Sequence, residues 1–164
     1  GSELTAQKML YQQDAFASEQ TVSVFGPRKQ VIPNVRILGP LREYNQIELA
    51  FTDARFLGID APVRISSDTA GTPGCYLVGP AGGLELDHGV IRAARHVHMS
   101  PSEAEYYGVE PGARMRLVVD GHQGGALEGL ICRVSDKERL EVHIDTDEGN
   151  AVDLANARLV YLEE

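Results

Sequence analysis

The sequence contains no tryptophan and only two cysteines among its 164 residues. Cys75 and Cys132 lie far apart and in no CxxC arrangement. This pattern indicates reduced thiols in an intracellular protein. Both cysteines stand beside apolar residues, which indicates buried packing rather than a catalytic role.

Positive charge is also scarce, because 15 Lys and Arg face 24 Asp and Glu, for a net charge of −9. The balance argues against nucleic acid or an anionic membrane as a partner, since both need a basic face. A small anionic substrate needs only a few converging arginines, and the candidates are Arg36, Arg42, Arg92 and Arg95.

Long apolar runs are missing too. No run approaches the roughly 20 residues that span a bilayer, and no signal peptide is visible. The opening Gly1-Ser2 looks like a cloning remnant, so we expect the natural N-terminus to lie upstream. We therefore expect a cytoplasmic protein whose targeting signals, if any, precede this sequence.

Glycine and proline are plentiful, with 17 and 8 residues, and they predict many turns and short strands. Residues 3–19 are polar and weakly patterned, and indicate a short helix or a loose arm. Strand-like runs follow at 21–25, 31–38, 46–50, 62–65, 75–78, 84–86, 89–94, 114–119, 129–134 and 140–144. The sequence thus predicts a mainly β fold.

Two short helices are predicted, each beginning with a capping hydroxyl, at Thr52 and at Ser100. Pro101 suits the first helical position of the second helix. Residues 53–59 resemble residues 103–109, which reveals an internal repeat. We expect two small related β-barrels with short helices, residues 1–70 and 71–164, with the boundary within 66–74.

The stretch around His96 and His98 is the most informative in the chain. In an extended strand these two side chains share one face, about 6.5–7 Å apart along the strand, and can converge on one ion. His143, in another alternating strand, is the best third ligand for zinc. The acidic residues Asp145, Asp147 and Glu148 follow it and are candidates to orient a ligating imidazole.

An interpretation without a metal stays open for the HxH pair. A HxH pair in a strand also occurs as two exposed histidines without a metal. His88 and His122 stand in turn-like contexts and are expected to be solvated. The repeat adds a further candidate, because Glu48 lies fifty positions before His98 and precedes the repeated helix by the same interval.

Arg42 has a guanidinium suited to phosphate or carboxylate, although a surface pairing with Glu43 would also explain it.

The chain resembles the PduL-type phosphate acyltransferases, the phosphate propanoyltransferases, from Thr21 to Asn150. The resemblance rests on ordered matches at residues 35–40, 46–48, 52–54, 62–64, 77–80, 95–99 and 143–148. It implies interconversion of acyl-CoA plus phosphate with acyl phosphate plus coenzyme A, for a short acyl group such as propanoyl or acetyl. It also implies two β-barrels and a dinuclear zinc site between them.

The resemblance assigns roles to individual residues. His96, His98 and His143 match the family's three-histidine metal site, and Glu48 matches a carboxylate of the same cluster. Arg42, the candidate catalytic residue, matches an arginine associated with phosphate. Coenzyme A is expected as a substrate, and phosphate is expected to attack directly, without a protein nucleophile. The sequence does not locate the coenzyme A pocket or fix the acyl chain length.

The family has a second HxH motif near its N-terminus, and none precedes Glu48 here. We therefore expect one complete zinc site in this chain and a second in a longer form, which leaves the activity of this chain open. A missing first strand would expose a sheet edge, so we expect a homo-oligomer. Free cytoplasm and a bacterial microcompartment, with shell or cargo partners, both stay open.

Two other functions remain as alternatives. A non-catalytic scaffold domain stabilised by metal would bind zinc with four protein ligands and no open position. A metal-dependent acyl-CoA hydrolase would use water in place of phosphate. A thiol-release assay with and without phosphate separates the three.

Overall fold

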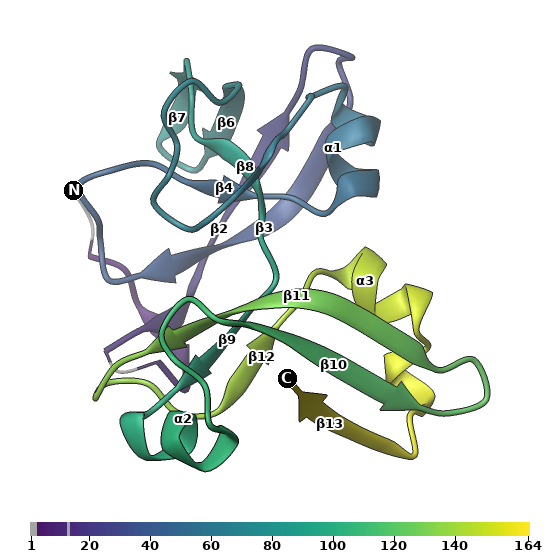
Figure 1. Cartoon of the computed structure of the whole chain (residues 1–164). Coiled ribbons are helices and arrows are strands. Elements are labelled where there is room, and N and C mark those ends of the chain that lie inside the picture. Colours follow the sequence, from purple (N-terminus) through teal and green to yellow (C-terminus); the bar gives the residue numbers. More distant parts are fainter. Residues whose placement is uncertain (1–2, 13) are drawn as a thin grey trace. The chain divides into compact units, whose positions relative to one another are not determined.

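The computed structural model describes residues 3–12 and 14–164, so Gly1, Ser2 and Gln13 lie outside the described residues (Figure 1). The chain divides into two compact units, the first ending at Ala93 and the second comprising Ala94–Glu164. The mainly β fold with short helices predicted from the sequence is confirmed.

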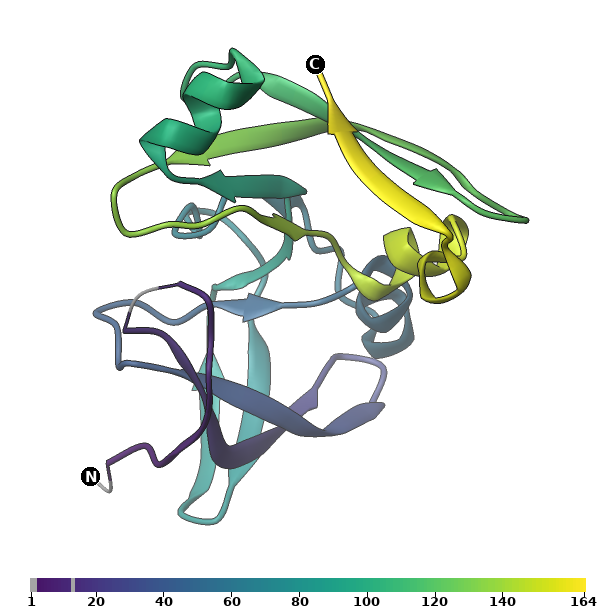
Figure 2. The same ribbon diagram turned by 90° about the horizontal axis from the view of Figure 1, so that it is seen from below.

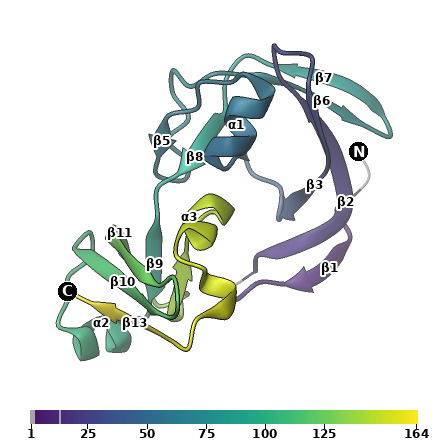
Figure 3. The same cartoon turned by 90° about the vertical axis from the view of Figure 1, so that its right-hand side faces the viewer.

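The first unit contains one helix and eight short or long strands among its described residues. They are β1 (Ala6–Met9), β2 (Phe16–Phe25), β3 (Val31–Gly39), β4 (Ile47–Glu48), α1 (Phe51–Leu57), β5 (Val63–Arg64), β6 (Cys75–Gly79), β7 (Gly82–Leu86) and β8 (Val90–Ala93). The strands β1, β2, β3, β6 and β7 form one curved sheet (Figure 3). In a separate small sheet, β8 pairs in parallel with β4 and with β5.

The second unit has one sheet with the strand order β12-β9-β11-β10-β13. Its elements are β9 (His96–Met99), α2 (Pro101–Tyr107), β10 (Arg114–Asp120), β11 (Gly125–Val134), β12 (Glu141–His143), α3 (Thr146–Ala151), the 3-10 helix η1 (Leu154–Asn156) and β13 (Leu159–Glu163). β13 runs antiparallel to β10 and ends near the C-terminus (Figure 2).

The boundary between the units differs from the predicted one. It lies between Ala93 and Ala94 rather than within residues 66–74. The reason is strand pairing across the turn-rich segment: β6 pairs with β2, and β8 pairs with β4 and β5. Residues 75–93 therefore complete the first unit instead of opening the second.

The polar segment at residues 3–19 is also different from the prediction. Its described part is neither a helix nor a loose arm, because β1 pairs antiparallel with the first residues of β2, with Met9 opposite Phe16. Its polar composition reflects exposure, since every residue of β1 is exposed. The strand β1 therefore lacks the alternating apolar residues from which a strand is predicted in a sequence.

The two predicted helices are both present, and one of them begins where the sequence predicted. α2 begins as predicted, with Pro101 at its first position and a capping box between Ser100 and Glu103. α1 begins two residues earlier than expected: Ala50 is its N-cap, without a side-chain cap, and Thr52 lies inside the helix. The predicted cap at Thr52 was wrong.

Both helices end in the same way, at a glycine in the left-handed conformation. Gly58 has φ 80° and ψ 27°, and Gly108 has φ 70° and ψ 24°. Glycine adopts this conformation without the steric cost that a Cβ imposes. The sequence repeat therefore corresponds to a repeated local structure.

Each unit has its own apolar core. The first includes Val24, Leu57 and Val90, and the second includes Val97, Met99, Met115 and Leu130. Cys75 lies in the first core and Cys132 in the second, both as free thiols. Buried packing of the cysteines is thus confirmed. Over the described part of the chain, no helix is long and apolar enough to cross a bilayer.

Candidate metal centre

The strand β9 places the two histidines of the HxH motif beside the third. It lies between β11, which runs parallel to it, and β12, which runs antiparallel. His96 is directly opposite His143 in the pairing with β12. Val97 is fully buried in the core between them, so the alternation of the strand turns His96 and His98 to the other face.

The three imidazoles form one compact cluster. Ring centroids lie 4.8 Å apart for His96 and His98, 4.7 Å for His96 and His143, and 4.5 Å for His98 and His143. One potential ligand atom from each residue lies within 4.8 Å of the others. The strand spacing thus brings the three predicted residues together, and their role as ligands stays a prediction.

The cluster fits a metal ion by its donor atoms and by the burial of His98. Three imidazole nitrogens suit zinc and similar ions, and zinc–nitrogen bonds of 2.0–2.1 Å would place the nitrogens about 3.3 Å apart in a tetrahedral site. The His98 side chain is only 3% exposed. Its Nδ1 and Nε2 are both buried and have no hydrogen-bond partner within the described part of the chain. A buried imidazole nitrogen without such a partner is available to bind a metal.

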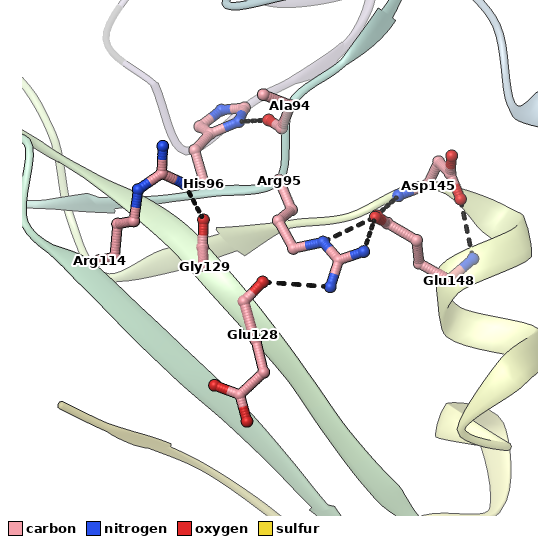
Figure 4. Close-up of polar contacts among 8 residues, drawn as sticks. All are labelled: Ala94, Arg95, His96, Arg114, Glu128, Gly129, Asp145 and Glu148. Atoms are coloured by element: carbon pink, nitrogen blue, oxygen red, sulfur yellow. Dashed lines mark hydrogen bonds and ion pairs between the residues drawn. The ribbon is translucent and has the colours of Figure 1, made fainter. Parts of the chain in front are cut away.

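Each imidazole also has an oxygen close to one ring nitrogen. Nδ1 of His96 lies 2.9 Å from the carbonyl oxygen of Ala94, as Figure 4 shows. Nδ1 of His98 lies 2.8 Å from a carboxylate oxygen of Glu138, and Nε2 of His143 lies 3.1 Å from one of Glu141. Metal-ligating histidines commonly have such partners, which fix the tautomer and the ring orientation.

The charge state of His98 favours metal binding. Burial lowers the pKa of His98 to about 4, and repulsion from His143 adds to the effect, while the carboxylate of Glu138 opposes it. The imidazole is therefore neutral at pH 7. Neutral histidine is the form that binds a metal.

Two of the three acidic residues that the sequence suggested as partners of the imidazoles have other contacts. Asp145 and Glu148 form the capping box of α3. Glu148 also pairs with Arg95, whose Nε and Nη2 both lie 2.8 Å from one of its oxygens (Figure 4). This network ties the residue before the HxH motif to the helix that follows β12.

Sequence reasoning missed the two carboxylates that do lie beside the histidines. Glu141 has a sequence signal, because it stands two positions before His143 in a strand and shares its face. Glu138 has none. It lies in the turn between β11 and β12, and only the fold brings it to His98.

The remaining predicted site residues belong to the first unit. Glu48 is exposed in β4, and one of its carboxylate oxygens accepts a hydrogen bond of 2.6 Å from Nε2 of Gln46. Arg42 is exposed and donates to the hydroxyl of Tyr44 at 2.9 Å, rather than pairing with Glu43. The participation of Glu48 and Arg42 in a metal or phosphate site stays a prediction.

The other arginines considered from the sequence are engaged locally. Arg36 donates to the carbonyl of Ser18 at 2.6 Å. Arg92 donates to the carbonyl of Ala61 at 2.8 Å and stacks over the ring of Phe51.

The histidines expected to be solvated are exposed. His88 lies 2.6 Å from Asp87, and His122 lies in the turn between β10 and β11. Both expectations are confirmed by the exposure of these side chains.

Comparison with known proteins identifies the family. The family model described as phosphate propanoyltransferase matches residues 1–155. The chain belongs to this family. The predicted family and the predicted enzyme class, an acyltransferase using phosphate, are thereby confirmed.

Relatives cover nearly all of the chain. A phosphate propanoyltransferase of Planctopirus limnophila is 56% identical over 99% of this chain and 67% of its own length. One of Thermotoga maritima is 45% identical over 100% of this chain and 78% of its own. One of Salmonella typhimurium is 47% identical over 98% of this chain and 78% of its own length.

Proposed function

We propose that this phosphate acyltransferase interconverts acyl-CoA plus phosphate with acyl phosphate plus coenzyme A, with zinc held by His96, His98 and His143. The acyl group is short, propanoyl or acetyl. The observation that carries the proposal is the three-histidine cluster with its orphaned buried nitrogen, in a chain of the phosphate propanoyltransferase family.

The histidines supply the metal site, and three protein ligands are the number typical of catalytic zinc. Bound zinc would supply Lewis-acid stabilisation of the negative charge that develops at the thioester during transfer. Glu138 and Glu141 lie next to two of the imidazoles and orient them.

The reaction is a direct displacement. A phosphate oxygen attacks the thioester carbonyl carbon, a C–O bond forms, the C–S bond breaks and the electron pair leaves with the sulfur of coenzyme A. We propose that the exposed guanidinium of Arg42 binds the phosphate and that Glu48 contributes a carboxylate to the metal cluster. Support for both roles comes from the family resemblance and, for Glu48, from the repeat that relates it to His98.

The cysteines support direct attack rather than an acyl-enzyme. Cys75 and Cys132 are buried, and burial raises the pKa of both thiols. A thiol with a raised pKa is a poor nucleophile at neutral pH because the thiolate is the reactive form. The predicted homo-oligomer and the association with a bacterial microcompartment rest on the resemblance and the sequence argument alone.

The test compares the parent protein with His143→Ala, and with His122→Ala as a control that removes an exposed turn histidine. Zinc content and phosphate-dependent thiol release from propanoyl-CoA are measured for each. We expect His143→Ala to lose both and His122→Ala to keep both. Full activity in a metal-free His143→Ala protein contradicts the proposal.

The same assay separates the rival functions. Thiol release that does not depend on phosphate indicates a hydrolase. Zinc retention without any thiol release indicates a scaffold domain.

A further inference from the structure

Glu138 lies in the turn between β11 and β12, and the backbone fixes its position. The amide of Ser135 donates to the carbonyl of Met99 at the end of β9, at 3.1 Å. The amide of Glu138 in turn donates to the carbonyl of Ser135, also at 3.1 Å. The turn is therefore anchored to the strand that carries the HxH motif.

The side chain of Glu138 is directed to His98 and buried with it. Its Oε2 lies 2.8 Å from Nδ1 of His98, and the two side chains are 11% and 3% exposed. A carboxylate loses much of its hydration at such a position, and the loss must be offset by specific partners. The contact is thus unlike a solvated surface pair, whose net contribution is small.

The opposite nitrogen of the same ring, Nε2, is buried as well. Neither ring nitrogen of His98 has a partner with hydrogen-bond geometry among the residues the structure describes, but Nδ1 has the carboxylate of Glu138 at 2.8 Å. A carboxylate this close to Nδ1 favours the tautomer with the proton on Nδ1, and that tautomer carries its lone pair on Nε2. One side of the imidazole is held by Glu138, and the other is left to accept a ligand.

We propose that Glu138 is a positioning residue, which holds His98 in the Nδ1–H tautomer and orients its Nε2 toward the metal. This inference rests on the metal site of the proposed function. It makes one ligand of that site dependent on a turn residue that lies outside the predicted motif.

The other two histidines are positioned differently. Nδ1 of His96 faces the backbone carbonyl of Ala94, which no side-chain substitution removes. Glu141, next to His143, is 31% exposed and the contact is longer, at 3.1 Å. Glu138 is the more buried of the two carboxylates, so its removal should cost more metal affinity than removal of Glu141.

The test uses the zinc-loaded parent, Glu138→Ala, Glu138→Gln and the control Asp136→Asn, which removes an exposed carboxylate from the same turn. Zinc affinity is measured by competition with a chromophoric chelator. We expect Glu138→Ala to weaken zinc binding about 10–100-fold, the range typical of such partners. Glu138→Gln should recover most of the loss, because its amide oxygen accepts the same proton, and Asp136→Asn should match the parent.

The tautomer of His98 is read separately by long-range 1H–15N correlation of the imidazole in parent and variants. The inference requires a proton on Nδ1 in the parent, in both the zinc-loaded and the metal-free protein. A parent with the proton on Nε2 overturns the inference, and this measurement needs no variant to fold.

The remaining outcomes are distinct. Unchanged zinc affinity in a folded Glu138→Ala protein overturns the inference and leaves the metal site standing. A parent that binds no zinc overturns the metal site, and the inference falls with it. Zinc binding without acyl transfer overturns the proposed reaction alone.

Discussion

The two units carry the same local design at equivalent positions with different chemistry. In the first, β4 is followed by α1, and in the second, β9 is followed by α2. Residues 47 and 49 are buried apolar residues, as are residues 97 and 99. The alternate positions are Gln46 and Glu48 in one unit and the two histidines of the HxH motif in the other.

The neighbours of these strands account for the difference. β4 is at the edge of its small sheet and pairs only with β8, in the order β4-β8-β5, over the described residues. β9 has a second neighbour, β12, which supplies His143. The turn before β12 supplies Glu138. A repeated strand and helix thus provide a polar face, and an additional strand turns that face into a candidate metal site.

The largest expected effect is a loss of zinc binding, which should differ between the equivalent positions His98 and Glu48. His98→Gln removes a nitrogen ligand and should weaken zinc binding by more than about 100-fold, beyond the loss typical of an outer partner. Glu48→Gln should keep zinc on the three histidines and lower phosphate-dependent thiol release at least about tenfold. Zinc content after dialysis and thiol release are measured on both. Complete loss of zinc from Glu48→Gln would show that the histidines alone do not hold the ion.

The second prediction concerns pH and the buried histidine of the second unit. The folded pKa of His98, about 4, lies below its ordinary value of 6.5. Between pH 6.5 and about pH 4, His98 is protonated in the unfolded chain and neutral in the folded protein. The free energy of unfolding therefore decreases as the pH falls through this range. In metal-free protein, the free energy of unfolding of the parent should fall relative to His98→Gln as the pH decreases from 7 to 4. A constant difference over that range would refute the assignment.

The third prediction compares the two glycines that end α1 and α2. A Cβ at Gly58 would lie 2.5 Å from Cγ of Arg28, whereas one at Gly108 would meet only Glu164, at 3.4 Å. Gly108→Ala should cost about 1 kcal/mol for the left-handed conformation. Gly58→Ala should cost about 2–3 kcal/mol, because Arg28 must also move and loses its bond to the carbonyl of Arg55. Urea unfolding of both variants checks this, and equal costs would contradict it.

The smallest effect concerns the helix N-termini. Ser100→Ala gives α2 the uncapped start that Ala50 gives α1, and should lower the free energy of unfolding by about 1 kcal/mol. Glu105→Ala, on the exposed surface of the same helix, is the control and should stay within about 0.5 kcal/mol of the parent. Thermal unfolding of the two proteins side by side gives the comparison. A Ser100→Ala protein as stable as its control would mean that the capping box contributes nothing.

Much of the candidate site follows from local pattern. Strand alternation places His96 and His98 on one face, and the repeat identifies Glu48 as the counterpart of His98. The boundary between the units did not follow from the sequence, because turn-rich residues 66–74 look like a linker and yet lie between strands of one unit. The cap of α1 was misjudged because a threonine suits both a cap and the first turn.

By itself the sequence determined the mainly β class, the repeat, the family and the three histidines, because periodicity, turn residues and ordered motifs are local properties of the chain. Only the tertiary structure decided which carboxylates lie next to the three histidines. Asp145 and Glu148, which follow His143 closely in the chain, cap a helix, whereas Glu138 lies in a turn and its carboxylate contacts His98. Side-chain proximity depends on strand pairing, and pairing depends on contacts between residues distant in sequence.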